Sequence, residues 1–161
     1  MNIQKIHELF LLNNSVSIDT RNIKSNDMFF AINGPNFNGN KFALEAIKKG
    51  CSYVVSDELE VSKLSNKIVY VEDSVKALQE LANYHRRTLN AKIIAITGSN
   101  GKTTSKEILL NVLKSKYNTI ATKGNLNNHL GVPLTLLSMN KDTEIGIIEM
   151  GANHLKEIEA L

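Results

Sequence analysis

The sequence has little cysteine and contains no hydrophobic run long enough for a membrane. Its single cysteine, Cys51, excludes an internal disulfide framework and any zinc site built from cysteines, which fits a reducing compartment. No segment approaches the roughly 18 apolar residues that a membrane helix needs. The apolar residues 6–12 are interrupted by His7 and Glu8, so neither a transmembrane span nor a secretory signal is expected. These patterns predict a cytoplasmic protein.

Charge of one sign is not concentrated anywhere in the chain. There are 19 Lys plus Arg and 16 Asp plus Glu, and no block of basic residues, so nucleic-acid binding is not expected. No pair of histidines has the spacing of metal ligands. What is present is an ordinary globular composition of 161 residues, 42% hydrophobic and 22% charged, which suffices for one domain or two small ones.

The first 88 residues alternate between helix-like and strand-like patterns. Residues 1–13 carry apolar side chains at helical spacing, and residues 16–40 contain short alternating runs broken by Asn-Gly pairs, which indicate strands joined by tight turns. Further helices are expected at 42–49 and 74–89, and buried strands at 51–55 and 67–71. We therefore expect a small α/β domain over residues 1–88, ending in a helical connector.

A second α/β unit begins near residue 91. Residues 92–97 are almost all apolar and β-favouring, which predicts a strand covered on both faces. Strands are also expected at 117–121 and 144–150, a helix at 102–116, and a helix with Pro133 in its first turn. The apolar stripe of the helix at 102–116 consists of Ile108, Leu109, Val112 and Leu113. This order of elements favours a parallel sheet with right-handed crossovers.

The strongest chemical motif is the segment TGSNGKTT at residues 97–104, between the expected strand and helix. Its glycines would let backbone N–H groups converge on phosphate oxygens, and Lys102 would add a positive charge for the β- and γ-phosphates. Thr103 would place its hydroxyl on Mg²⁺. The general motif has its first glycine where this sequence has Ile96, so the loop is two residues shorter. The alternative is a Gly-Lys turn that opens a helix without a ligand. The predicted phosphate-binding residues are Gly98, Ser99, Asn100, Gly101, Lys102, Thr103 and Thr104.

Three further groups are candidates for the site. Glu149 ends an apolar strand, where it could coordinate Mg²⁺ or simply be a solvated surface residue. The loop of residues 123–133 offers amide and imidazole groups for a polar ligand, although asparagines are also good loop formers. The Asp19-Thr20-Arg21 turn is either a charge-paired turn or an anion-binding site, and its spacing alone does not decide.

The phosphate loop resembles the short loop of the ATP-dependent Mur ligases and of their folylpolyglutamate synthase relatives. Residues 125–137 and 149–154 are similar to those members of the family that add D-alanyl-D-alanine. Residues 18–21 and 27–29, with Gly34, Gly39, Phe42, Ala46 and Gly50, resemble their uridine-nucleotide-binding domain. The sequence departs from that pattern where Thr20 replaces a serine, Ser25-Asn26 a Pro-Gly pair and Asn38-Gly39-Asn40 an Asp-Gly-His triplet.

The resemblance implies an ATP-dependent ligase of peptidoglycan precursor synthesis. ATP would phosphorylate the terminal carboxylate of UDP-N-acetylmuramoyl-tripeptide, and the amine of D-alanyl-D-alanine would attack the acyl phosphate. Lys102 and Glu149 would be catalytic, and Thr103 and Glu149 would hold Mg²⁺. Contacts to substrate would come from Thr20, Arg21, Asn127, Asn128 and His129. A monomer is expected for the full-length protein.

Family members continue well beyond residue 161, so the resemblance also implies a fragment. We expect residues 1–88 to form the first domain and residues 91–161 to begin an ATPase domain. Such a chain is expected to have no ligase activity alone and to expose an uncovered edge and face of its second sheet. The alternatives are another Mur ligase that adds a single amino acid, a nucleotide-binding module without catalysis, and a general phosphoryl-transfer kinase.

Overall fold

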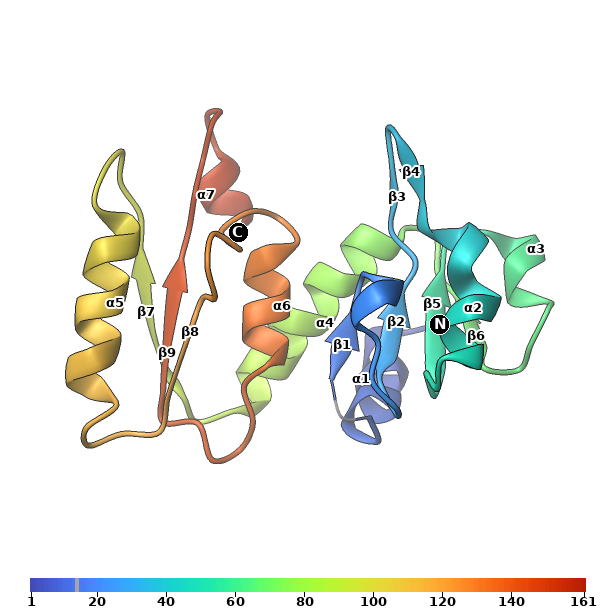
Figure 1. Cartoon of the computed structure of the whole chain (residues 1–161), viewed down its shortest axis with the longest axis horizontal. Coiled ribbons are helices and arrows are strands. Elements are labelled where there is room, and N and C mark those ends of the chain that lie inside the picture. The colour runs from blue at the N-terminus through green and yellow to red at the C-terminus, as the bar shows by residue number, and fades with distance from the viewer. Residues whose placement is uncertain (14) are drawn as a thin grey trace. The chain divides into compact units, whose positions relative to one another are not determined.

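The computed structural model in Figure 1 describes residues 1–13 and 15–161. The chain divides into two compact units, Met1–Tyr84 and His85–Leu161. This division falls inside helix α4 (Ser74–Thr88), a few residues before the boundary expected at residues 88–91. Within the described residues, no helix combines the length and the apolar character that crossing a membrane requires.

The first unit contains a four-stranded parallel sheet with the order β1-β2-β5-β6. Short crossovers connect its strands, and an antiparallel hairpin, β3–β4, follows β2. The strands are β1 (Val16–Ser17), β2 (Met28–Phe30), β3 (Asn33–Gly34), β4 (Phe37–Asn38), β5 (Tyr53–Ser56) and β6 (Ile68–Tyr70). The helices are α1 (Ile3–Leu11), α2 (Ala43–Lys48), α3 (Leu59–Ser62) and α4, with 3-10 turns η1 (Thr20–Asn22) and η2 (Gly39–Phe42).

The core of the first unit lies on its two central strands. All three residues of β2 are buried, and Phe29 packs in one cluster with Val54 of β5 and Ala46 of α2. Cys51 belongs to the same cluster, and its burial raises the pKa of the thiol to about 11, with the nearby charge of Asp27 adding to the effect. Cys51 is therefore a small core residue and is not an activated nucleophile.

The second unit is a three-stranded parallel sheet with the order β7-β9-β8. Helix α5 leads from β7 to β8, and helix α6 leads from β8 back to β9. Because these two connections run in opposite directions along the sheet, right-handed crossovers place the helices on opposite faces, as Figure 1 shows. The elements are β7 (Lys92–Ile96), α5 (Lys102–Leu113), β8 (Thr119–Ala121), α6 (Gly131–Leu137), β9 (Ile145–Glu149) and α7 (Glu157–Ala160).

One expectation for the second unit is wrong. β9 is the strand buried at all five positions, whereas β7 has no buried residue because, among the described strands, it pairs only with β9. The apolar stripe of α5 is covered along one side only, since Ile108 and Val112 are 61% and 62% exposed while Leu109 and Leu113 are partly buried. The one buried residue of this helix is Lys106.

Candidate active site

The phosphate loop joins β7 to α5 through two glycines with positive φ. Gly98 has φ 145° and Gly101 has φ 77°, which side-chain-bearing residues rarely adopt. Gly101 caps α5 without any side-chain hydrogen bond, so the N–H groups of the first turn point toward the place where an anion would bind. Lys102 Nζ donates to the carbonyl of Gly98 at 2.6 Å and thus lies over its own loop.

Three elements meet at the carboxylate of Glu149, at the end of β9. Its Oε1 accepts a hydrogen bond from Thr103 Oγ1 of α5 at 3.2 Å and one from Asn127 Nδ2 of the β8–α6 loop at 2.9 Å. The backbone N–H of Glu149 donates to Thr122 Oγ1 at 2.9 Å. Because Glu149 is only 1% exposed, the alternative of a solvated surface residue is wrong.

The second oxygen of Glu149 faces a lysine that the motif did not reveal. Oε2 is buried and accepts no hydrogen bond from any described residue, and Lys106 Nζ lies 3.6 Å from it. The side chain of Lys106 is fully buried. Lys106 follows Lys102 by four residues, which places both on the same side of α5. That spacing is the only sequence signal that could have drawn attention to Lys106.

The donor set beside the phosphate loop suits Mg²⁺. The Thr103 hydroxyl and Glu149 Oε1 are two oxygens 3.2 Å apart, and Mg²⁺ prefers oxygen ligands, with few from protein and the rest from phosphates and water. Among residues 1–13 and 15–161, no group of three His, Cys, Asp or Glu side chains could hold a metal. A Mg²⁺ ion bound here would therefore complete its coordination with a nucleotide and water.

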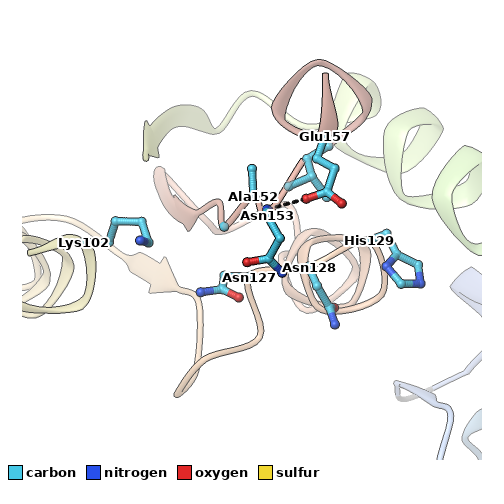
Figure 2. A pocket seen from close by; sticks show the side chains of 9 residues that line it. Lys102, Asn127, Asn128, His129, Ala152, Asn153 and Glu157 are labelled. Carbon is cyan, nitrogen blue, oxygen red and sulfur yellow. Dashed lines mark hydrogen bonds between the residues drawn. The ribbon is translucent and has the colours of Figure 1, made fainter. Parts of the chain in front are cut away.

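A cavity of about 590 Å³ opens at the same end of the sheet. Figure 2 shows Lys102 on one side of it, His129 on the other, and Asn127 and Asn153 between them. The residues that line it are Lys102, Asn127, Asn128, His129, Gly151, Ala152, Asn153, Glu157 and Leu161. The structure thus brings the lysine of the phosphate loop and all three predicted substrate residues of the 123–133 loop to one cavity.

The asparagines of that loop also have structural roles. The backbone oxygen of Asn127 accepts from Gly151 N at 2.8 Å, which joins the loop to the segment after β9. Asn128 Oδ1 accepts from the N–H groups of Leu130 at 3.1 Å and Gly131 at 2.9 Å, at the start of α6. Their contacts with a substrate stay predictions.

Glu157 shapes another wall of the cavity, although no sequence motif marks it. Its Oε2 accepts from the N–H groups of Asn153 at 2.6 Å and His154 at 3.2 Å, and its Oε1 lies 2.8 Å from His154 Nδ1. The side-chain hydrogen bond with His154, followed by the two backbone bonds, lowers the pKa of Glu157 to about 2. Lys156 precedes it with φ 70°, a left-handed conformation.

Thr20 and Arg21 lie in the first unit, on η1. The structure shows a charge-paired turn, in which Arg21 Nη2 lies 2.7 Å from Asp19 Oδ2. The hydrogen bond from the Arg21 side chain is the main reason why the pKa of Asp19 falls to about 2. Lys49 Nζ donates to the carbonyl of Thr20 at 3.0 Å. Anion binding at this turn stays a prediction.

The fold and the site together define a class of protein. A glycine loop between a strand and a helix of a parallel sheet, with a lysine, a threonine and a buried acid beside it, is typical of nucleotide-phosphate-binding α/β proteins. Family comparisons narrow this class. Residues 96–161 match the Mur ligase middle domain, and residues 14–86 match the description "Mur ligase family, catalytic domain". The chain belongs to the Mur ligase family.

Individual relatives are similar over nearly the whole chain. The UDP-N-acetylmuramoyl-tripeptide--D-alanyl-D-alanine ligase of Buchnera aphidicola is 40% identical over 158 residues, covering 98% of this chain and 34% of the relative. A crystal structure of MurF from Acinetobacter baumannii has a TM-score of 0.83 and 32% identity, over 98% of this chain and 37% of that one. A structure of MurF ligase from Thermotoga maritima in complex with ADP has a TM-score of 0.80 and 35% identity, over 92% of this chain and 34% of that one. This chain spans about a third of the length of the curated relatives it matches.

Proposed function

We propose that the chain carries the phosphate-binding part of an ATP-dependent ligase that joins D-alanyl-D-alanine to UDP-N-acetylmuramoyl-tripeptide. The observation that carries this proposal is the meeting of Thr103 and Asn127 at one oxygen of Glu149, beside the loop of Lys102. The relatives named for that reaction support it, as does the similar structure that holds ADP. In this proposal the first unit binds the uridine nucleotide through Thr20 and Arg21. Since ATP is a substrate, a cytoplasmic location is implied.

The residues of the site would act by positioning phosphate and neutralising its charge, which dominate phosphoryl transfer. The ammonium group of Lys102 would release the Gly98 carbonyl and bind phosphate oxygens instead. Thr103 and Glu149 would hold Mg²⁺, which supplies positive charge at the transferred phosphate when it is bound. Asn127, already bonded to Glu149, would face the acceptor substrate in the cavity together with Asn128 and His129.

The alternatives, another Mur ligase reaction or a nucleotide-binding module without catalysis, receive less support. A structure of the ligase that adds 2,6-diaminopimelate matches with 18% identity and a TM-score of 0.52, a likeness that concerns the fold alone. The first relatives all carry the name of the D-alanyl-D-alanine-adding enzyme. A nucleotide-binding module without catalysis would share the phosphate loop but would not need the asparagine loop of the cavity.

Calorimetric titration of the 161-residue chain with ADP and Mg²⁺ tests the proposed phosphate site. Lys102→Met should weaken ADP binding at least about tenfold, because a hydrogen bond to a charged group contributes roughly 1.5 to 3 kcal/mol. Lys114→Met is the matched control, since Lys114 is exposed directly after α5 ends and should leave the affinity unchanged. Equal ADP affinity for wild type and Lys102→Met would contradict the proposal.

A further inference from the structure

We propose that Lys106 is a positioning residue for this site. Its buried ammonium group determines which oxygen of Glu149 faces the phosphate loop, and it holds the loop of residues 123–130 next to that carboxylate. The inference rests on the proposed function, because it concerns how Glu149 is presented to a Mg²⁺-nucleotide. Lys106 has no exposed surface, so it would act through Glu149 and the loop without touching a ligand itself.

The ammonium group of Lys106 lies among three oxygen atoms. Its Nζ donates to the carbonyl of Gly124 at 3.1 Å and lies 3.2 Å from Glu107 Oε1 and 3.6 Å from Glu149 Oε2. Burying a lysine and a glutamate together is costly, and an apolar pair of similar size often gives equal or greater stability. Stability alone therefore gives a weak reason for this pair beside the phosphate loop.

The two oxygens of Glu149 are chemically alike, so only their surroundings decide which one faces the loop. Oε1 accepts hydrogen bonds from Thr103 and Asn127, whereas Oε2 lies near the charge of Lys106 and accepts none from the part of the chain that the structure describes. When the Thr103 oxygen turns a lone pair to a metal ion, the geometry of its hydrogen bond to Oε1 would change. Lys106, which is shielded from any ligand, would remain in place and keep Oε2 turned inward.

Lys106 also anchors this loop at Gly124, where the packing is sparse. Gly124 has φ 54°, and a Cβ added there would meet no atom within 4 Å. Leu126, two residues later, is 42% exposed. The bond from Lys106 to the Gly124 carbonyl therefore links α5 to the loop just before Asn127, the residue that donates to Glu149.

Four variants of the 161-residue chain test this role: Lys106→Met, Glu149→Gln, the double variant with both changes, and the exposed control Lys114→Met. Hydrogen exchange without nucleotide reports on the loop through the amides of Leu126 and Asn127, which are bonded within it. Lys106→Met should speed their exchange roughly tenfold or more relative to wild type, given the strength of a charged hydrogen bond. These amides should likewise exchange roughly tenfold faster or more in the double variant than in Glu149→Gln. The double variant removes both buried charges, so it keeps the test valid if Lys106→Met alone does not fold.

A second measurement separates positioning from stability. The ratio of the ADP dissociation constant in EDTA to that in Mg²⁺ should fall at least about fivefold in Lys106→Met. In the double variant, this ratio of ADP dissociation constants should be no lower than in Glu149→Gln alone. An unchanged or increased ratio in Lys106→Met would overturn the proposal even if loop exchange rose, and so would faster exchange spread evenly over the whole second unit. If wild type fails to bind ADP, the proposed function fails, while loop exchange still decides whether Lys106 holds the loop.

Discussion

Gly39 illustrates how one residue can determine the path of the chain. It lies between the β3–β4 hairpin and α2, and its N–H donates to the carbonyl of Ile32 at 2.9 Å. A Cβ at Gly39 would stand 2.6 Å from that carbonyl oxygen and 2.8 Å from the Ile32 nitrogen. Since both atoms belong to the backbone, no side-chain rotation can relieve the clash, and only glycine fits.

Gly39→Ala should therefore destabilise the first unit by about 1 to 3 kcal/mol, the usual cost of forcing extra volume into a packed site. Gly34→Ala, in the adjacent hairpin, is the matched control, because its Cβ would have Phe37 O as nearest neighbour at 3.9 Å. Urea unfolding followed by circular dichroism measures both. Equal unfolding midpoints for the two variants would show that the backbone near Ile32 can move aside.

Sequence reasoning reaches some residues of the site and misses others for a physical reason. Lys102 and Thr103 belong to a local motif, and Glu149 follows from the rule that ligands bind at the carboxyl ends of parallel strands. Lys106 and Glu157 look like ordinary surface residues of short helical segments. Lys106 meets Gly124 and Glu149, which are distant from it in the sequence, and no local pattern encodes those contacts. Glu157 bonds to Asn153 and His154, four and three residues before it, but these residues form no motif that marks a site.

Among the short elements, the segment that follows β9 depends on one carboxylate. Glu157 accepts two backbone N–H groups and pairs with His154, and these bonds lower its pKa from 4.5 to about 2. A carboxylate whose pKa is lower in the folded state stabilises the fold fully above its unfolded pKa. Its contribution is therefore present above about pH 4.5 and is lost as the pH falls toward 2.

We expect the amides of Asn153 and His154 to lose protection against hydrogen exchange between pH 4.5 and 2, after correction for intrinsic rates. Glu157→Gln should already show weak protection at pH 6 and little further loss on acidification. Glu159→Gln, an exposed acid two residues away, is the control and should behave like wild type. Identical pH dependence in Glu157→Gln and wild type would mean that another group holds this segment.

The position of a strand along the sequence is easier to predict than the number of strands that pair with it. Hydrophobic runs correctly indicate β7 and β9 as strands, but the apolar pattern of β7 also suggested cover on both faces. The hydrophobic pattern of a strand shows which of its residues can be buried. It does not show how many strands pair with that strand. β9 is buried because it has a partner on each side, and β7 has only one among the described strands.

At the scale of the whole molecule, the two units have separate sheets and separate cores. Val54 lies in the core of the first unit and Ile147 in that of the second, and both are fully buried. The edge strand β7 has no buried residue, in line with the uncovered edge that the sequence leads one to expect in the second sheet. Ile108 and Val112 of α5 add exposed apolar side chains to this unit. Self-association through that surface stays a prediction.

Separate cores predict separate responses to mutation. Val54→Ala and Ile147→Ala should each remove about 2 to 4 kcal/mol from the unit that contains them, through lost burial and a cavity. Hydrogen exchange in low urea should then speed up in β2, β5 and β6 for Val54→Ala, and in β8 and β9 for Ile147→Ala. Each variant is the control for the other, because the unmutated unit should keep its wild-type exchange. Faster exchange in both sheets from either variant would show one cooperative unit, in which α4, continuous across the division, transmits the loss.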